Sequence, residues 1–252
     1  MRSPHPRPTV LWSGGLTVSA RPLATRRGWA HLVLTGAHGQ DTALARPDVI
    51  ATWLDTLRRA GFDGVRTGAV GPGVAADLTA AGFTAVQDLV LLSCDLTTGP
   101  RAGADPRIDR IRTKWVRRQT DIQQVLGIDA ASFGPDWALD RVAFDEACAA
   151  TQRSRLMACR DADGTAAGFV LAGATAGSGF IQRLAVIPDR RRGGTATRLL
   201  AQAHRWLAGS GCSTSVVNTE TTNEAALGLY QRFGYAPLPY GLRVLERPLA
   251  DR

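Results

Sequence analysis

Apolar residues recur along the chain at two different spacings, one typical of strands and one typical of helices. The helical spacing is clearest over residues 195–208, where apolar side chains fall at positions i, i+3, i+4 and i+7 of one buried face. Those side chains are Ala196, Leu199, Leu200, Ala203 and Leu207. Gly209 and Gly211 follow them, and glycine at this place predicts the end of the helix.

The same reading predicts the other elements of the chain. Before residue 97 it predicts strands at 31–34 and 86–94, a strand or turn at 65–70, and helices at 48–60 and 74–81. After residue 107 it predicts strands at 111–116, 155–160, 166–174, 180–186, 213–217 and 242–246, and helices at 121–132, 139–150 and 224–233 besides 195–208. Strands that alternate with helices in this way predict an α/β protein.

One segment, TTGPRAGADPR at 97–107, breaks both patterns with glycine, proline and charge, and it predicts a linker. We therefore expect a first domain at 1–96, a linker at 97–106 and a second domain at 107–252. The segments 61–83 and 211–235 share a glycine, a short strand, a helix of small residues and an aromatic residue after glycine. This likeness indicates that the two domains arose by duplication.

Composition excludes several classes of protein. The chain has 252 residues, 44% hydrophobic and 21% charged, which is typical of a globular protein rather than a disordered one. Its net charge of +8 favours an anionic partner. However, its basic residues are dispersed among acidic ones and are not interleaved with aromatic residues, so we expect no nucleic-acid partner.

The cysteine and histidine residues indicate neither disulfides nor a metal site. The four cysteines are far apart, no C-x-x-C pair occurs, and no histidine stands at ligand spacing. We expect reduced thiols and no bound metal. No stretch of about 18 apolar residues and no signal-like N-terminus occurs, so we expect a cytoplasmic protein without a membrane partner. Its oligomeric state stays open.

The most concentrated positive charge lies in LAVIPDRRRGGTATRLL, residues 184–200. A predicted strand, a turn with proline, two glycines and the start of a helix follow one another here. Free N–H groups and the dipole at a helix N-terminus attract anions, and glycine lets the backbone approach a phosphate closely. Arginine side chains at the rim add charge-assisted hydrogen bonds. The segment therefore predicts an anion site, and the alternative is a solvated basic loop.

A second segment, NTETTNEAALGLYQRFGY at 218–235, opens another predicted helix. Thr221 and Glu224 have the spacing of a capping box for that helix. On this reading Asn223 is a residue of the helix start and Tyr230 is a packed aromatic side chain.

Together the two segments resemble the signatures of the GCN5-related N-acetyltransferase (GNAT) superfamily. The first resembles its R/Q-x-x-G-x-G/A loop after V-x-P, and the second its N-x-A-x-x-L-Y-x-x-x-G-F/Y motif. The resemblance implies a GNAT fold with acetyl-CoA as co-substrate, its pyrophosphate held by the loop and its pantetheine arm by the preceding strand. The implied cofactor-binding residues are Leu184, Ala185, Val186, Arg191, Arg192, Gly193, Gly194, Thr195, Ala196 and Asn223.

The resemblance also implies an activity, the transfer of an acetyl group to a primary amine of a peptide or small molecule by direct attack. Tyr230 would protonate the leaving thiolate, and backbone N–H groups at 184–186 would stabilise the oxyanion. Related enzymes carry a Glu five residues before the signature Asn, where this chain has Asn218. An amide cannot accept a proton at useful pH, so the general base stays unassigned, with Glu220 as a candidate.

The segment IDAASFGPDWALDRVAFDEA, residues 128–147, covers the region that lines the acceptor site in this family. Its carboxylates favour a cationic amine, or else they form the outer faces of amphipathic helices. They are Asp129, Asp136, Asp140, Asp145 and Glu146. The F-x-P-x-W sequence of Phe133, Pro135 and Trp137 is similar to the acceptor loop of ribosomal-protein N-terminal acetyltransferases.

The first domain lacks these signatures. Leu78 stands where Tyr230 stands in the second domain, and no R-x-x-G-x-G/A loop precedes the helix at 48–60. We expect a partial, degenerate GNAT-like domain at 1–96 beside a catalytic domain at 107–252, an arrangement that resembles tandem enzymes of the family. The alternative function is a non-catalytic protein that binds CoA or serves as a scaffold.

Overall fold

The computed structural model describes residues 9–13, 16–35, 47–98, 112–115, 119–160 and 165–249. The chain forms two compact units, Met1–Val90 with Pro239–Arg252 and Leu91–Leu238. We refer to these as unit 1 and unit 2. The sequence placed the last residues in a second domain at 107–252, whereas here residues 239–252 group with the first part of the chain.

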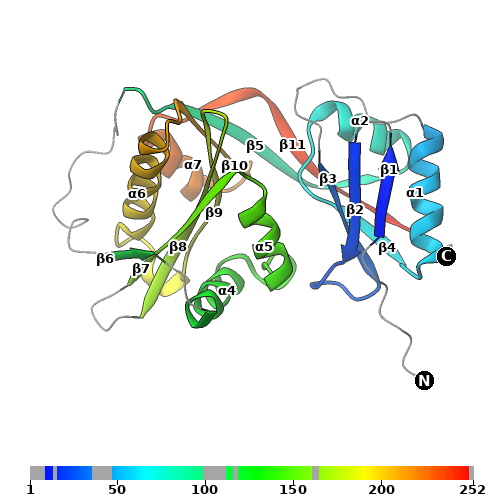
Figure 1. Cartoon of the computed structure of the whole chain (residues 1–252), viewed down its shortest axis with the longest axis horizontal. Coiled ribbons are helices and arrows are strands. Elements are labelled where there is room, and N and C mark those ends of the chain that lie inside the picture. The colour runs from blue at the N-terminus through cyan, green and yellow to red at the C-terminus, as the bar shows by residue number, and fades with distance from the viewer. Residues whose placement is uncertain are drawn as a thin grey trace. The chain divides into compact units, whose positions relative to one another are not determined.

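Unit 1 is a twisted sheet with two helices (Figure 1). Its strands lie in the order β1-β2-β3-β4-β11-β5, and β3 and β4 are parallel because α1 connects them. The strands are β1 Thr9–Ser13, β2 Leu16–Pro22, β3 Trp29–Thr35, β4 Gly64–Thr67, β5 Thr84–Asp95 and β11 Ala236–Pro248. The helices are α1 Pro47–Arg59 and α2 Pro72–Ala80. Buried side chains of both helices, Leu57 and Leu78 among them, form one core with the strands.

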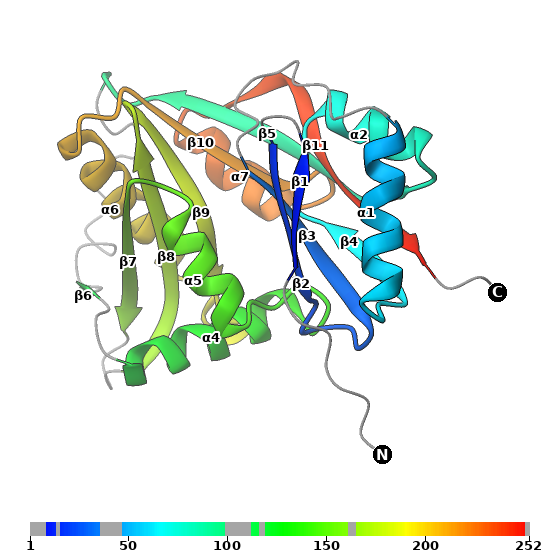
Figure 2. The same cartoon turned by 45° about the vertical axis from the view of Figure 1, so that its right-hand side comes forward.

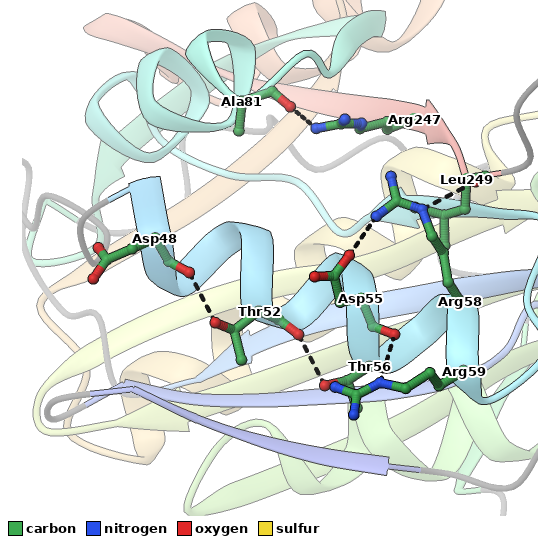
Figure 3. A network of polar contacts seen from close by, with 9 residues as sticks. All are labelled: Asp48, Thr52, Asp55, Thr56, Arg58, Arg59, Ala81, Arg247 and Leu249. Atoms are coloured by element: carbon green, nitrogen blue, oxygen red, sulfur yellow. Dashed lines mark hydrogen bonds and ion pairs between the residues drawn. The ribbon is translucent and has the colours of Figure 1, made fainter.

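The C-terminal strand completes unit 1. The Thr67 Oγ1 accepts a hydrogen bond from the Leu245 N–H at 3.0 Å, beside the antiparallel pairing of β11 with β4. Figure 3 shows two further attachments: the Arg58 Nε donates to the Leu249 carbonyl at 3.1 Å, and Arg247 donates to the Ala81 carbonyl. Unit 1 therefore depends on residues about 150 positions beyond its own first part.

Unit 2 contains a sheet covered by helices on both faces. Its strands lie in the order β5-β10-β9-β8-β7-β6, and β9 and β10 are parallel because α6 connects them. The further strands are β6 Arg112–Trp115, β7 Arg153–Arg160, β8 Ala166–Thr175, β9 Ser178–Val186 and β10 Thr214–Glu220. The helices are α4 Gln119–Phe133, α5 Arg141–Ala149, α6 Thr195–Gly209 and α7 Glu224–Arg232. Helices α4 and α5 lie on one face and α6 on the other (Figures 1 and 2).

The predicted elements are all present, and most lie within about three residues of their predicted bounds, but β11 begins at Ala236, well before the predicted start at 242. The expected face of α6 is confirmed for Leu199, Leu200, Ala203 and Leu207, which are buried, whereas Ala196 in the first turn is half-buried. Two strands that the pattern did not predict, β1 and β2, precede β3. Most of the predicted linker lies outside the described residues. No helix in the described part of the chain has the length and apolar content needed to cross a membrane.

The two units repeat one connection, strand–helix–strand–helix. In unit 1 it is β3-α1-β4-α2, and in unit 2 it is β9-α6-β10-α7. Each of the four helices ends in a left-handed glycine, followed by a backbone N–H that bonds to a carbonyl five residues earlier. These bonds run from Phe62 to Leu57, Phe83 to Leu78, Cys212 to Leu207 and Tyr235 to Tyr230, at 3.0–3.1 Å. This correspondence supports the predicted duplication and places Leu78 at the position of Tyr230.

Candidate functional site

Strands β9 and β10 of unit 2 pair along only part of their length. Their parallel pairing runs from Ser178 opposite Thr214 to Ile181 opposite Val217. Strand β9 continues to Val186 and β10 to Glu220, and in these described residues neither strand pairs with the other. The edge of β9 over 182–186, which includes the predicted residues Leu184, Ala185 and Val186, therefore keeps backbone groups that are not used by β10.

The predicted anion loop joins this open edge to helix α6. The chain leaves β9 through a short 3-10 helix, Pro188–Arg190, and α6 begins after Gly194. Gly194 has a left-handed φ of 83° and is the N-cap, so no side chain caps the helix there. The first turn carries no acidic residue. The N–H groups of the first turn, at Thr195 and Ala196, are thus available at the positive end of a 15-residue helix dipole.

The three arginines of the loop differ in their contacts. Arg191 donates from Nε to the Val186 carbonyl at 3.2 Å and from Nη2 to the Ser132 carbonyl at 3.4 Å. It therefore ties the loop to the end of β9 and to α4. Arg192 is exposed and has a left-handed φ of 66°, and Arg190 is exposed as well. Gly193 has ample space, since a Cβ atom there would lie 3.8 Å from the nearest neighbour.

A bulge in β9 turns two consecutive side chains towards the helices α4 and α5. Leu171 of β8 pairs with Arg183 and Ala172 pairs with Ile181, so Gln182 is the extra residue. The Gln182 Nε2 donates to the Ala147 carbonyl of α5 at 2.6 Å, while its Oε1 is buried with no partner among the described residues. Arg183 contacts α4. No signal in the sequence predicted Gln182, because a bulge depends on the neighbouring strand.

Arg183 of β9 and Asp129 of α4 form an ion pair with two hydrogen bonds. The Asp129 side chain is 0% exposed and receives Nε and Nη2 of Arg183 at 2.7 and 2.9 Å. The same carboxylate accepts the Leu139 N–H at 2.7 Å, and Nη2 also donates to the Trp137 carbonyl at 2.7 Å. The guanidinium lies 3.5 Å from the centre of the Phe133 ring. The pair thus connects β9, α4 and the loop before α5.

These contacts bear on the carboxylates that the sequence placed near an acceptor entrance. Asp129 is buried and neutralised by Arg183, which is incompatible with a place at an open entrance. Asp140 is the N-cap of α5 and accepts the Ala143 N–H at 2.6 Å. Asp145 pairs with Arg141 at 2.8 Å on the exposed side of α5. Asp145 therefore fits the alternative, the outer face of an amphipathic helix, and Asp140 is a helix cap, whereas the buried Asp129 fits neither reading.

The two candidates for a base lie on one face of β10. Because the strand stays extended to Glu220, Asn218 and Glu220 point in the same direction, opposite to buried Ser215 and Val217. Both are exposed. Ser215 faces His204 of α6 through Tyr235, so Asn218 and Glu220 point towards the other face of the sheet, which also carries Gln182 and Arg183.

Helix α7 starts one turn away from β10, and its cap differs from the prediction. The N-cap is Asn223, whose side chain accepts the Ala226 N–H at 3.1 Å. The predicted capping box is therefore wrong, because the N-cap is Asn223 and not Thr221, and Glu224 is the first helical residue instead of the third. The turn that closes β10, with the Asn223 N–H on the Glu220 carbonyl at 3.1 Å, moves the helix start to Asn223.

Tyr230 lies in the last turn of α7 and is 5% exposed. Its ring contacts that of Tyr235 edge to face, with centres 5.4 Å apart. Burial raises the pKa of the Tyr230 phenol well above its ordinary value, so the phenol keeps its proton at neutral pH. Such a group can donate a proton and cannot act as a base.

Tyr235 belongs to a separate buried network. Its hydroxyl bonds to Nε2 of His204 at 2.8 Å and to Oγ of Ser215 at 2.6 Å. Burial lowers the pKa of His204 to about 4, so the imidazole is neutral at physiological pH. The four cysteines are free thiols, three of them buried. No group of three or more potential metal ligands occurs among the described residues.

Comparison with known proteins identifies the domain that carries these features. Residues 122–235 match the model of the acetyltransferase (GNAT) family. No curated protein matches the sequence. The fold is similar to that of a GCN5-related N-acetyltransferase from Kribbella flavida, with 17% identity over 96% of this chain and 90% of that chain, and a TM-score of 0.62.

Two further solved structures have similar folds. A GCN5-related N-acetyltransferase from Sphaerobacter thermophilus is 16% identical over 94% of this chain and 78% of its own, with a TM-score of 0.62. A tandem GNAT protein from the clavulanic acid biosynthesis pathway is 12% identical over 98% and 85%, with a TM-score of 0.63. Each likeness covers nearly the whole chain, so the fold shared with these proteins includes both units.

Proposed function

Residues 122–235 are a domain of the acetyltransferase (GNAT) family, and from this premise we propose that the chain transfers an acetyl group from acetyl-CoA to a primary amine. The observation that carries the proposal is the parting of β9 from β10 beside the uncapped N-terminus of α6. A strand edge with free backbone groups next to a helix dipole suits a long amide-containing arm that ends in phosphates.

The residues of unit 2 fit acetyl-CoA in this place. The backbone of Leu184, Ala185 and Val186 would bind the pantetheine arm along the open edge of β9. The first-turn N–H groups of Thr195 and Ala196, after Gly193 and Gly194, would receive the pyrophosphate. A left-handed glycine is needed there because a side chain at Gly194 would strain the backbone.

Arg191 and Arg192 of the loop would have different roles. Arg192 is exposed and supplies positive charge to the phosphates, whereas Arg191 holds the loop in shape through the Val186 and Ser132 carbonyls. Asn223 caps α7 and would contact the cofactor arm from the side of β10.

When bound, acetyl-CoA supplies an activated acyl thioester. The chain's part is to orient the amine and to move protons. Tyr230 carries its proton at neutral pH and would give it to the leaving sulfur. The amine would approach from the face that carries Gln182, Arg183 and Asn218, where Glu220 is the candidate carboxylate to take a proton, directly or through water.

The assay that tests this proposal measures acetyl-CoA-dependent acetylation of a panel of amines, peptides first, by release of free CoA thiol. We expect turnover with at least one primary amine, and a loss of about 10²-fold or more in Tyr230→Phe, since general acid catalysis is typically worth that much. The affinity for acetyl-CoA should stay unchanged, because Phe keeps the packing of the ring.

Tyr235→Phe is the matched control. It also removes a phenol hydroxyl, but this hydroxyl belongs to the buried network of His204 and Ser215. The variant should therefore lose stability, while its turnover should stay within a few-fold of wild type. Equal turnover of Tyr230→Phe and the wild type would refute the role of Tyr230. Acetyl-CoA binding without turnover on any amine would favour the non-catalytic alternative.

A further inference from the structure

Unit 2 has a concave surface on the sheet face opposite to α4 and α5. A cavity of ≈ 300 Å³ lies between β7 and α6, at the lower end of the volumes that small-molecule sites occupy. Its lining residues are Arg155, Met157, Gln202, Arg205 and Trp206. Residues two apart on β7 and residues three or four apart on α6 share a face, so both elements present these side chains to the same space.

The cavity is separate from the proposed cofactor site. Gln202 is seven residues beyond the start of α6 at Thr195, about 10 Å along the helix axis, and Trp206 is about 16 Å along it. Strand β7 is separated from the open edge of β9 by β8. The phosphates proposed at the N-terminus of α6 therefore do not account for it.

The charged residues that line the cavity, Arg155 and Arg205, have the same sign. Neither α6, TATRLLAQAHRWLAG, nor β7, RSRLMACR, contains an acidic residue. Arg205 is exposed and Arg155 is half-buried, so both guanidinium groups are positioned at the cavity. A concave surface lined by one sign of charge concentrates ligands of the opposite sign.

The apolar part of the lining is flat and polarisable. The half-buried Trp206 indole lies beside Arg155, whose guanidinium carbon is 5.8 Å from the ring centre. The buried Met157 thioether adds a second surface that suits an aromatic ring. Gln202 offers an amide hydrogen bond at the same place.

We propose that this cavity binds a planar aromatic anion, with the ring against Trp206 and Met157 and the carboxylate or phosphate on Arg155 and Arg205. Guanidinium groups bind both anions in a bidentate manner, so the two chemistries share one site. The site lies outside the proposed acyl-transfer machinery and needs no acetyl-CoA.

The test is calorimetric titration of the full chain with two probes, 2-naphthoate and adenosine monophosphate, each with and without saturating acetyl-CoA. We expect at least one probe to bind saturably, with one molecule per chain, and this binding should persist in saturating acetyl-CoA and weaken as salt rises. Preference for naphthoate identifies a carboxylate ligand, and preference for the nucleotide identifies a phosphate ligand.

Variants locate the binding. Arg205→Gln should weaken it about tenfold, as the loss of one charge-assisted hydrogen bond does. Trp206→Leu should weaken it about tenfold through the loss of stacking. Arg141→Gln, which removes an exposed positive charge on α5, is the control and should leave it unchanged.

Three results would overturn the proposal. The first is no saturation by either probe up to about 10 mM, which is weaker than a specific site of this kind requires. The second is displacement of the probe by acetyl-CoA, which would place it in the cofactor site. The third is equal binding by wild type, Arg205→Gln and Trp206→Leu. Arg205 is exposed, so Arg205→Gln should fold even if Trp206→Leu does not.

Discussion

At the scale of single residues, a buried ion pair between Asp129 and Arg183 connects the elements of unit 2. The carboxylate of Asp129 has no exposed surface, and its partner Arg183 makes a third bond to the Trp137 carbonyl. A buried charge that loses its partner is costly, because the remaining ion is neither solvated nor paired. The orientation of β9 and of the loop before α5 therefore depends on this pair.

Asp129→Ala should lower the free energy of unfolding by about 3 kcal/mol or more, which is the typical cost of breaking a buried pair from one side. Denaturation in urea measures this. Asp145→Ala is the control, because it breaks the exposed pair with Arg141 and should cost less than about 1 kcal/mol. Similar losses in the two variants would show that burial of the Asp129–Arg183 pair does not increase its contribution to the free energy of unfolding.

His204 makes stability depend on pH. Its pKa is about 4 in the folded chain and 6.5 in the unfolded chain, so only the unfolded chain takes up this proton between those values. Stability is therefore fully present above pH 6.5 and falls as pH falls towards 4, by up to about 3 kcal/mol from this group. Denaturation curves of wild type and His204→Gln across this window should converge as pH falls. Parallel curves would contradict the assignment.

At the scale of elements, the two halves of the sequence exchange strands. Within unit 1, β11 from the end of the chain lies next to β4, and within unit 2 the last residues of β5 lie next to β10. The sequence predicted both strands and their approximate bounds, because periodicity is local. It did not predict their neighbours, because these contacts join residues far apart in the sequence, such as Glu246 of β11 with Arg66 of β4, and Leu96, just after β5, with Ser213.

The same distinction between local and distant contacts explains the site. Residues 184–196 were predicted as a strand, loop and helix start, since glycine, proline and periodicity mark those features locally. The bulge at Gln182, the Asp129–Arg183 pair and the cap at Asn223 were not predicted. Each depends on a neighbouring element or turn, and the sequence shows only the residue types.

The strand exchange predicts the behaviour of fragments. A fragment of residues 107–252 lacks β5 and leaves the edge of β10 unpaired, so it should be unfolded or aggregated alone. Mixed with a fragment of residues 1–106, it should regain the circular dichroism and cooperative unfolding of the whole chain. Cooperative folding of 107–252 alone would show that the exchanged strand is dispensable.

At the scale of the whole molecule, the two units share the same order of strands and helices, but the residues proposed for acyl transfer lie in unit 2. Unit 1 repeats the strand–helix–strand–helix order and the helix-ending bonds of unit 2, yet it carries Leu78 at the position of Tyr230. A leucine cannot donate a proton. Because unit 1 also lacks the R-x-x-G-x-G/A loop, we expect one acetyl-CoA site in each chain, in unit 2.

The measurement that tests this claim most directly is calorimetric titration with acetyl-CoA of wild type, Gly194→Glu and Gly211→Glu. Both glycines lie at ends of α6 with φ near 80°, so the two variants share the same backbone strain and added charge. Only Gly194 lies at the proposed phosphate site. We expect one acetyl-CoA per chain with micromolar affinity for wild type and Gly211→Glu, and no binding by Gly194→Glu. Absence of binding by the wild type, or unchanged binding by Gly194→Glu, would contradict the account.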